Sequence, residues 1–479
     1  MARVSVTSRF LPPGGMPRAY AHAIALLVIL VVCGGLWSRT PVAPFGEFDQ
    51  PFYLGIAHDI RTLGRFTDGY VFADPAKAEH PAGMRFAPLY PGLLAGAMTL
   101  DPAFARGADC LVATGKLDDT TCPRDACLVR GIQFAMLAGV MLLIFSLARY
   151  LLGGTRPGAI ALALALITVP MLLRYVNYTM TELTTLALLS GGLSALAVTA
   201  RTRSMQWALA AGILFGLTAL TRPACLYGFL AIALGGIVLA RTRTTSIPSG
   251  RIAAAFVAGG LVCLAPWVAR NAIVLGHPAL TRGYDSHTLV QRIAYDQMTW
   301  GQLGQSIVCW LPDGKGLGER VFGKDACEPF GWETAAQSGP TASFYTIGNG
   351  SLMTETVKAA GGWDAHLSYL VRNYLVTQPI KHAVVTLSMA LRGAWISQWW
   401  GFLLGLVCMA RTWQAVRRGD TAFLAITLPC WFMLLFHAAV AVNQPRYNLF
   451  LILPYAICGA DFIESFLRTR HSFGDRLPR

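Results

Sequence analysis

Ten apolar segments, most of them close to 20 residues long, constrain the fold of this chain more than any other feature. A helix that crosses a lipid bilayer needs about 20 mainly apolar residues, because its backbone must satisfy its own hydrogen bonds there. The composition agrees, since 54% of the residues are hydrophobic and 13% are charged, against roughly a quarter charged in soluble domains. The sequence therefore predicts an all-α polytopic membrane protein. The predicted spans are 20–37, 128–149, 157–174, 180–200, 205–221, 223–240, 252–272, 393–411, 421–441 and 447–466.

The positive charge is unevenly distributed between the two sides of these spans. With the N-terminus placed in the cytoplasm, the inward-facing segments contain 17 of the 39 Lys and Arg residues and four of the 25 acidic residues. Cytoplasmic loops of membrane proteins carry this kind of basic excess. The net charge of +14 therefore indicates orientation, with both termini in the cytoplasm, and no nucleic-acid partner is needed to explain it.

This topology divides the chain into five parts. They are a cytoplasmic tail (1–19), a transmembrane core (20–272) that includes a first external loop (38–127), a large external loop (273–392), the C-terminal spans (393–466) and a second cytoplasmic tail (467–479). The loop from 273 to about 379 is polar and Gly-rich, and most of it lacks a helix or strand period. We expect it to act as a lid or an acceptor-binding loop.

Five of the 11 cysteines lie in the two external loops. If that side of the membrane is oxidising, disulfides can form there. We expect one bond between Cys309 and Cys327 and a second within the group Cys110, Cys122 and Cys127, whose pairing the sequence leaves open. No C-x-x-C pattern supports a metal site.

The stretch 45–94 contains the most reactive side chains of the external loops. Asp49 and Tyr53 fall on one face of a predicted amphipathic helix over 50–63, which can lie on the membrane surface. A second interfacial helix is predicted over 88–100. A carboxylate beside basic and aromatic groups at this interface suits chemistry on a charged lipid head group. Asp49 could instead cap the helix that follows it.

Several predicted spans carry ionisable residues at their outer ends, on the same side as Asp49. Charges at this depth are costly and usually face a cavity or a partner. Glu182 and Arg222 can pair across two spans as a structural charge pair. Arg270 lies just beyond Trp267, an expected interface anchor.

Five short motifs resemble those of one enzyme superfamily. FDQPFYLGIAHDI is similar to a D-E-x-x-Y signature, and APLYPGLL to a P-P-L-Y-P element. GILFGLTALTRP resembles G-L-x-x-L-x-R-P, APWVARN resembles P-W-x-x-R-N, and RYNLFLILP resembles an R-Y element. These are motifs of the GT-C glycosyltransferases of family 39, which include protein O-mannosyltransferases and lipid A aminoarabinose transferases. The matches follow the family's order from 48 to 454.

The resemblance implies a GT-C-like bundle of about 10–11 transmembrane helices with interfacial helices in the first external loop. It also implies an inverting transfer of a sugar from a polyprenyl-phosphate donor to a glycan, lipid or protein acceptor among the membrane lipids. The expected location is a bacterial inner membrane, with the site facing the periplasm. No cofactor is certain, and a divalent metal is compatible with the family.

An inverting transfer needs a general base near the acceptor hydroxyl and positive charge at the departing phosphate. The resemblance places Asp49 as the base. The candidate phosphate-binding residues are Arg85, Arg270 and Arg446, and the candidate substrate-binding residues are Tyr53, Tyr90, Glu47, Glu79 and His80. Burial at the interface should raise the pKa of Asp49, which favours a base.

One position departs from the family pattern. Gln50 stands where many relatives have Glu, so a role of that acid in binding metal or acceptor is open or passes to Glu47 or Glu79. The arginines also have a simpler interpretation, since basic side chains at span ends reach toward lipid head groups. The tyrosines could likewise belong to an interfacial aromatic belt.

Two other functions fit part of the pattern. A transporter or flippase of a lipid-linked substrate would also contain charges at membrane depth, but it predicts inverted repeats that the sequence does not show. A non-catalytic membrane assembly subunit could keep the fold and not need the base. Substitution of Asp49 discriminates both alternatives from the enzyme.

Overall fold

The computed structural model describes residues 18–45, 48–69, 81–114, 121–241, 249–331 and 342–474. Throughout these ranges the regular structure is helical, and the β interactions are limited to one isolated antiparallel bridge between Thr67 and Ala82. The predicted all-α class is therefore confirmed.

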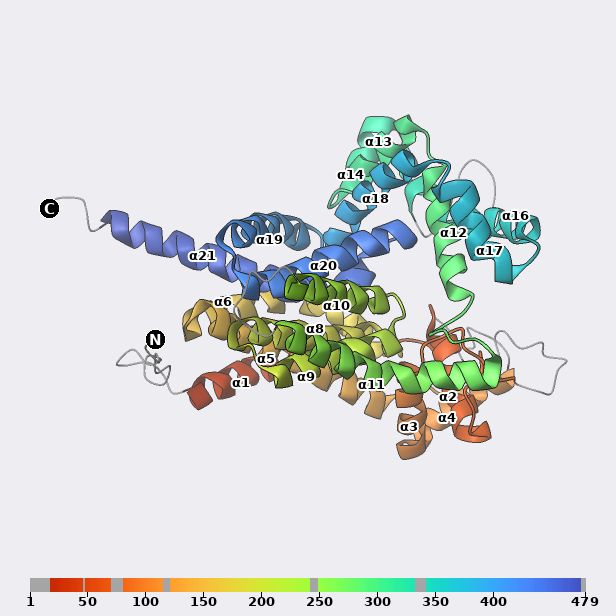
Figure 1. Ribbon diagram of the computed structural model, residues 1–479, viewed down its shortest axis with the longest axis horizontal. Helices are drawn as coiled ribbons and strands as arrows, with labels where there is room; N and C mark the ends of the chain where they lie inside the picture. The colour runs from red at the N-terminus through yellow and green to blue at the C-terminus, as the bar shows by residue number, and fades with distance from the viewer. Residues whose placement is uncertain are drawn as a thin grey trace.

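The apolar helices form one elongated bundle (Figure 1). Each of the ten predicted segments is helical, and 157–174 is built from two helices that meet at a bend of 59°. The bundle helices are α1 (Arg18–Trp37), α5 (Cys127–Leu152), α6 (Thr155–Leu166), α7 (Val169–Asn177), α8 (Glu182–Thr202), α9 (Met205–Thr221), α10 (Cys225–Arg241), α11 (Ser249–Leu275), α19 (Trp399–Arg418), α20 (Thr421–Val440) and α21 (Ile452–Gly474).

By length and composition, six helices of the described residues can cross a membrane, or up to eight if each of two bent pairs is one span. The second bent pair joins α18 (Pro379–Ala394) to α19 at an angle of 115°. The prediction of ten spans was too high on this criterion, because α9 and α10 belong to the shorter apolar helices of 10–17 residues. Both pack against α11 within the bundle. The protein is an integral, multi-pass membrane protein.

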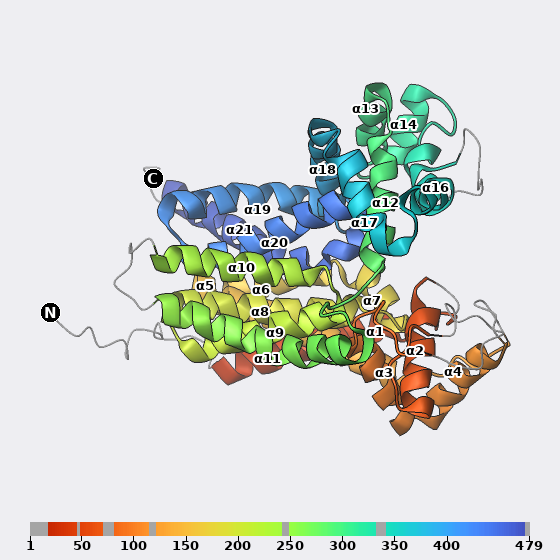
Figure 2. The same ribbon diagram turned by 45° about the vertical axis from the view of Figure 1, so that its right-hand side comes forward.

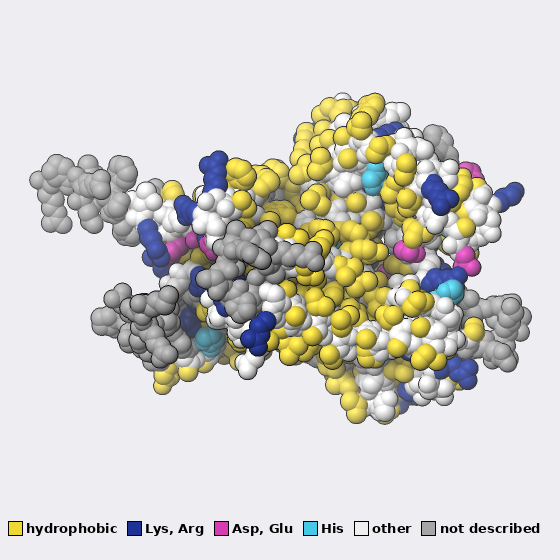
Figure 3. Space-filling model, in the orientation of Figure 1, with side chains coloured by type: hydrophobic (Ala, Val, Ile, Leu, Met, Phe, Trp, Pro, Cys, Tyr) yellow, Lys and Arg dark blue, Asp and Glu magenta, His cyan; other side chains and the backbone are white. Residues whose placement is uncertain are grey.

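Charged and apolar side chains are distributed unevenly along the bundle (Figure 3). The start of α1 and the end of α21 lie at one end, and the two external segments form lobes at the other end (Figures 1 and 2). Hydrophobic side chains cover the middle of the visible face, whereas Lys and Arg gather toward both ends (Figure 3). This distribution is the one that a bilayer around the middle of the molecule requires.

The first external lobe contains the helices α2 (Gln50–Leu63), α3 (Leu89–Leu100) and α4 (Pro102–Thr114). Both interfacial helices predicted in this loop are present, and α2 has the predicted bounds. It ends at Gly64, whose left-handed φ of 65° glycine adopts without strain. The predicted second disulfide joins Cys110 to Cys122, and Cys127 is free.

The second external lobe is helical, which corrects the expectation of a loop without periodicity. Its helices are α12 (Tyr284–Asp296), α13 (Trp300–Cys309), α14 (Gly314–Phe322), α15 (Phe344–Asn349), α16 (Ser351–Ala360), α17 (Trp363–Leu370) and α18. Most are too short to show a clear hydrophobic period, and they are stabilised by local caps and mutual packing. Thr299 and Gln302 form a capping box at α13, and the predicted Cys309–Cys327 disulfide is present.

A buried arginine fastens this lobe to the bundle. The side chain of Arg292 on α12 is fully buried and donates to the carbonyl of Ala438 on α20 at 2.6 Å. It also pairs with Asp296 at 2.7 Å, and Asp296 in turn accepts from His382 on α18 at 2.7 Å. A buried charge is tolerated only when it is paired and hydrogen-bonded in this way.

Two helices of the bundle approach so closely that only glycine fits between them. A Cβ atom at Gly212 of α9 would lie 1.9 Å from the carbonyl oxygen of Phe256 on α11, and one at Gly259 of α11 would lie 2.3 Å from that of Leu209. Small residues of this kind let membrane helices pack through backbone contacts. The crossing supports the outer end of α9, where Arg222 follows.

We expect the substitution Gly212→Leu to lower the free energy of unfolding by about 1–3 kcal/mol, because the added side chain must push α9 and α11 apart. Thermal unfolding of the purified protein in detergent measures the effect. Gly235→Leu is the matched control, since a Cβ at Gly235 on α10 meets no atom within 4 Å. Equal unfolding temperatures for the two variants would contradict this account of the crossing.

Candidate active site

A cavity of about 560 Å³ opens between the two lobes and the bundle. Its polar lining comes from the start of α2, the turn between α9 and α10, the start of α12 and the outer end of α20. The polar and charged residues in its lining include Asp49, Tyr53, Arg85, Thr221, Arg222, Thr281, Tyr284, Asp285, Thr288, Gln291, His437 and Tyr447. The cavity therefore collects side chains that are far apart in the sequence.

The lining also contains apolar and aromatic side chains from three bundle helices. They include Leu226 and Tyr227 of α10, Val268 of α11, and Phe436 and Val440 of α20. Tyr227 stacks on Phe436 with 4.4 Å between ring centroids and is 48% exposed. Apolar and aromatic side chains of three bundle helices, α10, α11 and α20, therefore form part of the cavity lining.

Asp49 is half-buried, and its side chain is part of the cavity lining. It occupies the N-cap position of α2 but makes no capping hydrogen bond with its side chain, so the helix-cap interpretation is not supported. Burial raises the pKa of its carboxyl, and the positive charges of Arg446 and Arg222 oppose that rise. This is the direction expected from the sequence, and it leaves a carboxylate that can accept a proton under mild conditions.

The neighbouring Gln50 has a structural function. Its side chain is fully buried. Its Nε2 donates to the carbonyl of Pro44 at 2.8 Å, and its Oε1 accepts from the backbone N–H and the hydroxyl of Thr179 at 2.8 and 3.0 Å. An amide can both donate and accept in this way, whereas an ionised Glu only accepts. The departure from the family's acid pair thus joins the start of α2 to the segment before α8.

Glu182 is in contact with Arg222, which lines the cavity. Arg222 Nη2 donates to Glu182 Oε1 at 3.1 Å, and the Glu182 side chain is fully buried. The guanidinium carbon of Arg222 also lies 5.0 Å from the ring centroid of Tyr447. The pair connects α8 to the turn after α9.

Arg446 and Arg85 bring two further positive groups to the cavity region. The guanidinium carbon of Arg446 lies 5.5 Å from the ring of Phe48 and 5.2 Å from that of Tyr447, and its charge acts on Asp49. Arg85 lines the cavity, and its backbone N–H donates to Asp68 Oδ1 at 2.8 Å.

Two of the candidate side chains are directed elsewhere. Arg270 donates to the carbonyls of Gly83 and Phe66 at 2.7 and 3.1 Å, which holds the first lobe against the end of α11. Tyr90 is fully buried and donates to Gln133 Oε1 at 3.2 Å. Neither residue is part of the cavity lining.

Three candidates lie outside the described residues, namely Glu47, Glu79 and His80. Tyr53 does line the cavity, where its ring makes an edge contact with Tyr90 at 5.5 Å between centroids. Burial raises the pKa of its hydroxyl, so Tyr53 stays neutral and can donate a hydrogen bond.

Several lining residues were missed in the sequence. His437 is an ionisable residue inside an apolar segment, which is a usable signal for a functional site. Tyr447 directly follows the candidate Arg446. Tyr284 and Asp285 begin α12, and no sequence pattern connects them to the first external loop.

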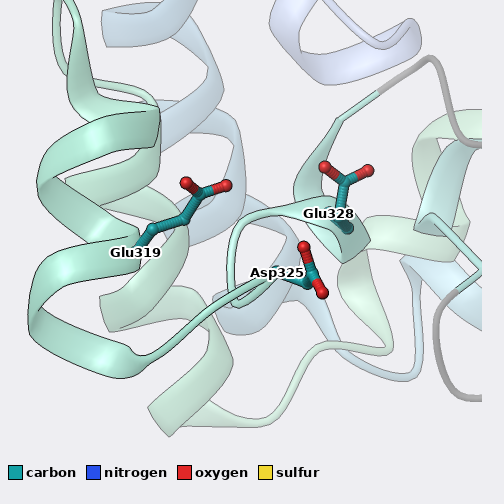
Figure 4. Close-up of side chains that lie close together, drawn as sticks. All are labelled: Glu319, Asp325 and Glu328. Carbon is teal, nitrogen blue, oxygen red and sulfur yellow. The ribbon is translucent and has the colours of Figure 1, made fainter.

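A metal-compatible group of carboxylates lies in the second lobe. Side-chain oxygens of Glu319, Asp325 and Glu328 lie within 4.8 Å of one another (Figure 4). Lys315 already pairs with Glu328 at 2.7 Å. Among the described residues this is the one such group of three, and none of its members lines the cavity. Among the described residues, those beside Asp49 form no such group, and Glu47, Glu79 and His80 lie outside the residues that the structure describes. No step proposed below uses a metal.

No family model matches the sequence, and no curated protein matches it. Solved structures are similar to the chain. An oligosaccharyltransferase from Archaeoglobus fulgidus, in complex with Zn and sulfate, shares 14% identity and a TM-score of 0.47 over 95% of this chain and 50% of its own. Its apo form gives a TM-score of 0.48 at 14% identity, over 96% and 53% of the two chains.

A third similar structure is ArnT from Cupriavidus metallidurans bound to undecaprenyl phosphate. It shares 14% identity and a TM-score of 0.37, over 93% of this chain and 78% of its own. This chain covers about half the length of the Archaeoglobus fulgidus oligosaccharyltransferase. None of the TM-scores reaches 0.5, so the proposed function rests on the cavity itself.

We expect Glu182→Gln to lower the free energy of unfolding by about 3 kcal/mol, because it leaves the charge of Arg222 without its buried partner. Chemical or thermal unfolding in detergent measures the change, and Glu182→Gln combined with Arg222→Gln should recover part of it. Arg468→Gln is the matched control: its pair with Glu464 spans 3.4 Å at a side chain that is 69% exposed. That control should change stability by less than about 1 kcal/mol. An equal decrease in the free energy of unfolding for Glu182→Gln and the control would show that the buried pair stabilises the protein no more than the exposed one.

Proposed function

We propose that this protein is a membrane glycosyltransferase that moves a sugar from a polyprenyl-phosphate donor to an acceptor on the outer face of the membrane. One observation carries the proposal. The half-buried carboxylate of Asp49 and the side chains of Arg85 and Arg222 share a cavity with apolar side chains of the bundle helices α10, α11 and α20. A polar head group on a long apolar chain fits such a mixed lining.

The proposed reaction is an inverting displacement. The acceptor hydroxyl forms a bond to the anomeric carbon of the sugar, the bond from that carbon to the phosphate oxygen breaks, and the polyprenyl phosphate leaves with the electron pair. Asp49 takes the proton of the hydroxyl as general base. Arg85, which lines the cavity, stabilises the negative charge on the departing phosphate, for which guanidinium groups are well suited. Arg446 does not line the cavity, but its positive charge acts on Asp49 and adds to this stabilisation. A polyprenyl chain would extend along the wall formed by α10, α11 and α20.

Two features support an extracytoplasmic site in a bacterial inner membrane. Both disulfides lie in the external lobes, which requires an oxidising compartment such as the periplasm. The basic excess lies at the opposite end of the bundle. In this orientation a lipid-linked donor reaches the cavity from the outer leaflet of that membrane.

We expect Asp49→Asn to lower the rate of sugar transfer by about 10²–10⁴-fold, the range typical of a general base, while the protein still inserts and still binds a polyprenyl phosphate. Transfer is measured as glycan loss and donor accumulation, by mass spectrometry of membrane lipids and envelope glycans. Asp109→Asn is the matched control, because Asp109 pairs with Arg61 on the same lobe outside the cavity. A normal glycan profile with Asp49→Asn would favour a transporter or an assembly subunit.

We expect the acidic limb of the pH–rate profile to lie above the ordinary Asp pKa of about 3.9. Only the ionised carboxylate can act as base, so activity falls as the pH drops through the raised pKa of Asp49. Because Arg446 lowers that pKa, Arg446→Gln should move the limb to higher pH, whereas Arg446→Lys should leave it near the wild-type position. If the acidic limb does not move in Arg446→Gln, the charge of Arg446 does not control the pKa of Asp49.

A further inference from the structure

A second cavity, of about 360 Å³, lies where the two external lobes meet. Its volume falls within the roughly 300–1,000 Å³ typical of small-molecule sites. Three parts of the chain line it: the first lobe around Asp68 and Arg85, the connection that contains His277 and Arg282, and the start of α17 with Trp363 and Asp364. Arg85 lines both cavities, so the two adjoin at this side chain.

The walls of this second cavity are held by specific contacts. The backbone N–H of Arg282 donates to the carbonyl of Met84 at 3.2 Å, and its side chain contacts Asp364 and His277. Asp68 accepts from the N–H of Arg85. Gly83 permits this approach, because a Cβ there would lie 2.3 Å from Asp68 Oδ1.

The charges on the walls balance. Two arginines, Arg85 and Arg282, and two aspartates, Asp68 and Asp364, line the cavity, and acidic, basic and histidine side chains gather between the lobes in Figure 3. A balanced wall selects neither a strong anion nor a strong cation. Hydroxyl groups both donate and accept, so a neutral polyhydroxylated ligand can bridge carboxylates and guanidinium groups at the same time.

Trp363 adds an aromatic surface to this polar wall. It is 44% exposed, and its ring makes an edge contact with His366 at 5.4 Å between centroids. His366 is fully buried and in hydrogen-bond contact with Thr356 at 2.8 Å, so the indole rests on a fixed support. A partly exposed, supported indole offers an apolar face to the C–H groups of a sugar ring, while its polar neighbours bind the hydroxyls.

We propose that this second cavity binds the acceptor and that the acceptor is a neutral carbohydrate. The proposal rests on the proposed transferase function. The first cavity, whose lining includes apolar side chains of the bundle, receives the donor from the membrane, and the second receives the acceptor from the aqueous side between the lobes. The two substrates meet beside Arg85, which lines both cavities, and Asp49 lines the first. The acceptor hydroxyl that enters the first cavity is the one that loses its proton to Asp49.

The test measures carbohydrate binding separately from donor binding. The full chain in lipid nanodiscs is titrated with neutral hexose oligosaccharides of two to six units, and separately with a polyprenyl phosphate. We expect oligosaccharide binding that inorganic phosphate does not displace. Trp363→Ala should weaken it by about tenfold, and Trp363→Phe should restore it to within about threefold of wild type. Neither substitution should change polyprenyl phosphate binding.

Trp300→Ala is the matched control, because Trp300 is a 61% exposed indole on α13 of the same lobe, outside both cavities. Its oligosaccharide affinity should equal that of wild type. Absence of oligosaccharide binding, unchanged affinity in a folded Trp363→Ala variant, or displacement by phosphate would each overturn the acceptor assignment while the donor site stands. If the Trp363→Ala variant does not fold, Trp363→Phe and Asp364→Asn are measured in its place. Weaker oligosaccharide binding by Asp364→Asn supports the assignment, and unchanged binding opposes it. Failure of wild type to bind polyprenyl phosphate would instead overturn the proposed function.

Discussion

The hydrogen bonds of Gln50 position the whole candidate site. This buried amide joins the connection after α1, through Pro44, to the segment before α8, through Thr179. The first residue of α2 is thereby fixed against the bundle, and Asp49, directly before it, lies at the cavity. A carboxylate that is held by its backbone rather than by a capping hydrogen bond remains available for proton transfer.

The cavity also depends on where the bilayer ends. Charged groups at the outer ends of the spans would be costly alone, and the structure pairs or stacks them: Arg222 contacts Glu182, and Arg446 lies near the rings of Phe48 and Tyr447. Apolar side chains of α10, α11 and α20 line the same cavity. A single cavity thus combines charged and apolar surfaces, and the second cavity adjoins it at Arg85.

Most of the bundle could be predicted, and most of the second lobe could not. Long apolar runs such as α5 and α8 are determined by the cost of exposing backbone groups to lipid, which any 20-residue window reveals. The helices of the second lobe contain 6–16 residues and are stabilised by one another, so their hydrophobic pattern is broken at each turn. Arg270 shows the same limit for side chains: its guanidinium binds the carbonyls of Phe66 and Gly83, about 200 residues away in the sequence.

The sequence alone determined the order of the apolar segments, the bounds of α2 and the cysteines able to pair, because these follow from local composition and from the energetics of the bilayer. Only the tertiary structure decided which ionisable side chains share a cavity. Asp49, Arg222 and Tyr284 come together through the crossing of α9 with α11 and the docking of α12 on α20, and no local pattern records such contacts. The physical reason is that side-chain proximity depends on the packing of whole helices, whereas helix formation depends on neighbours along the chain.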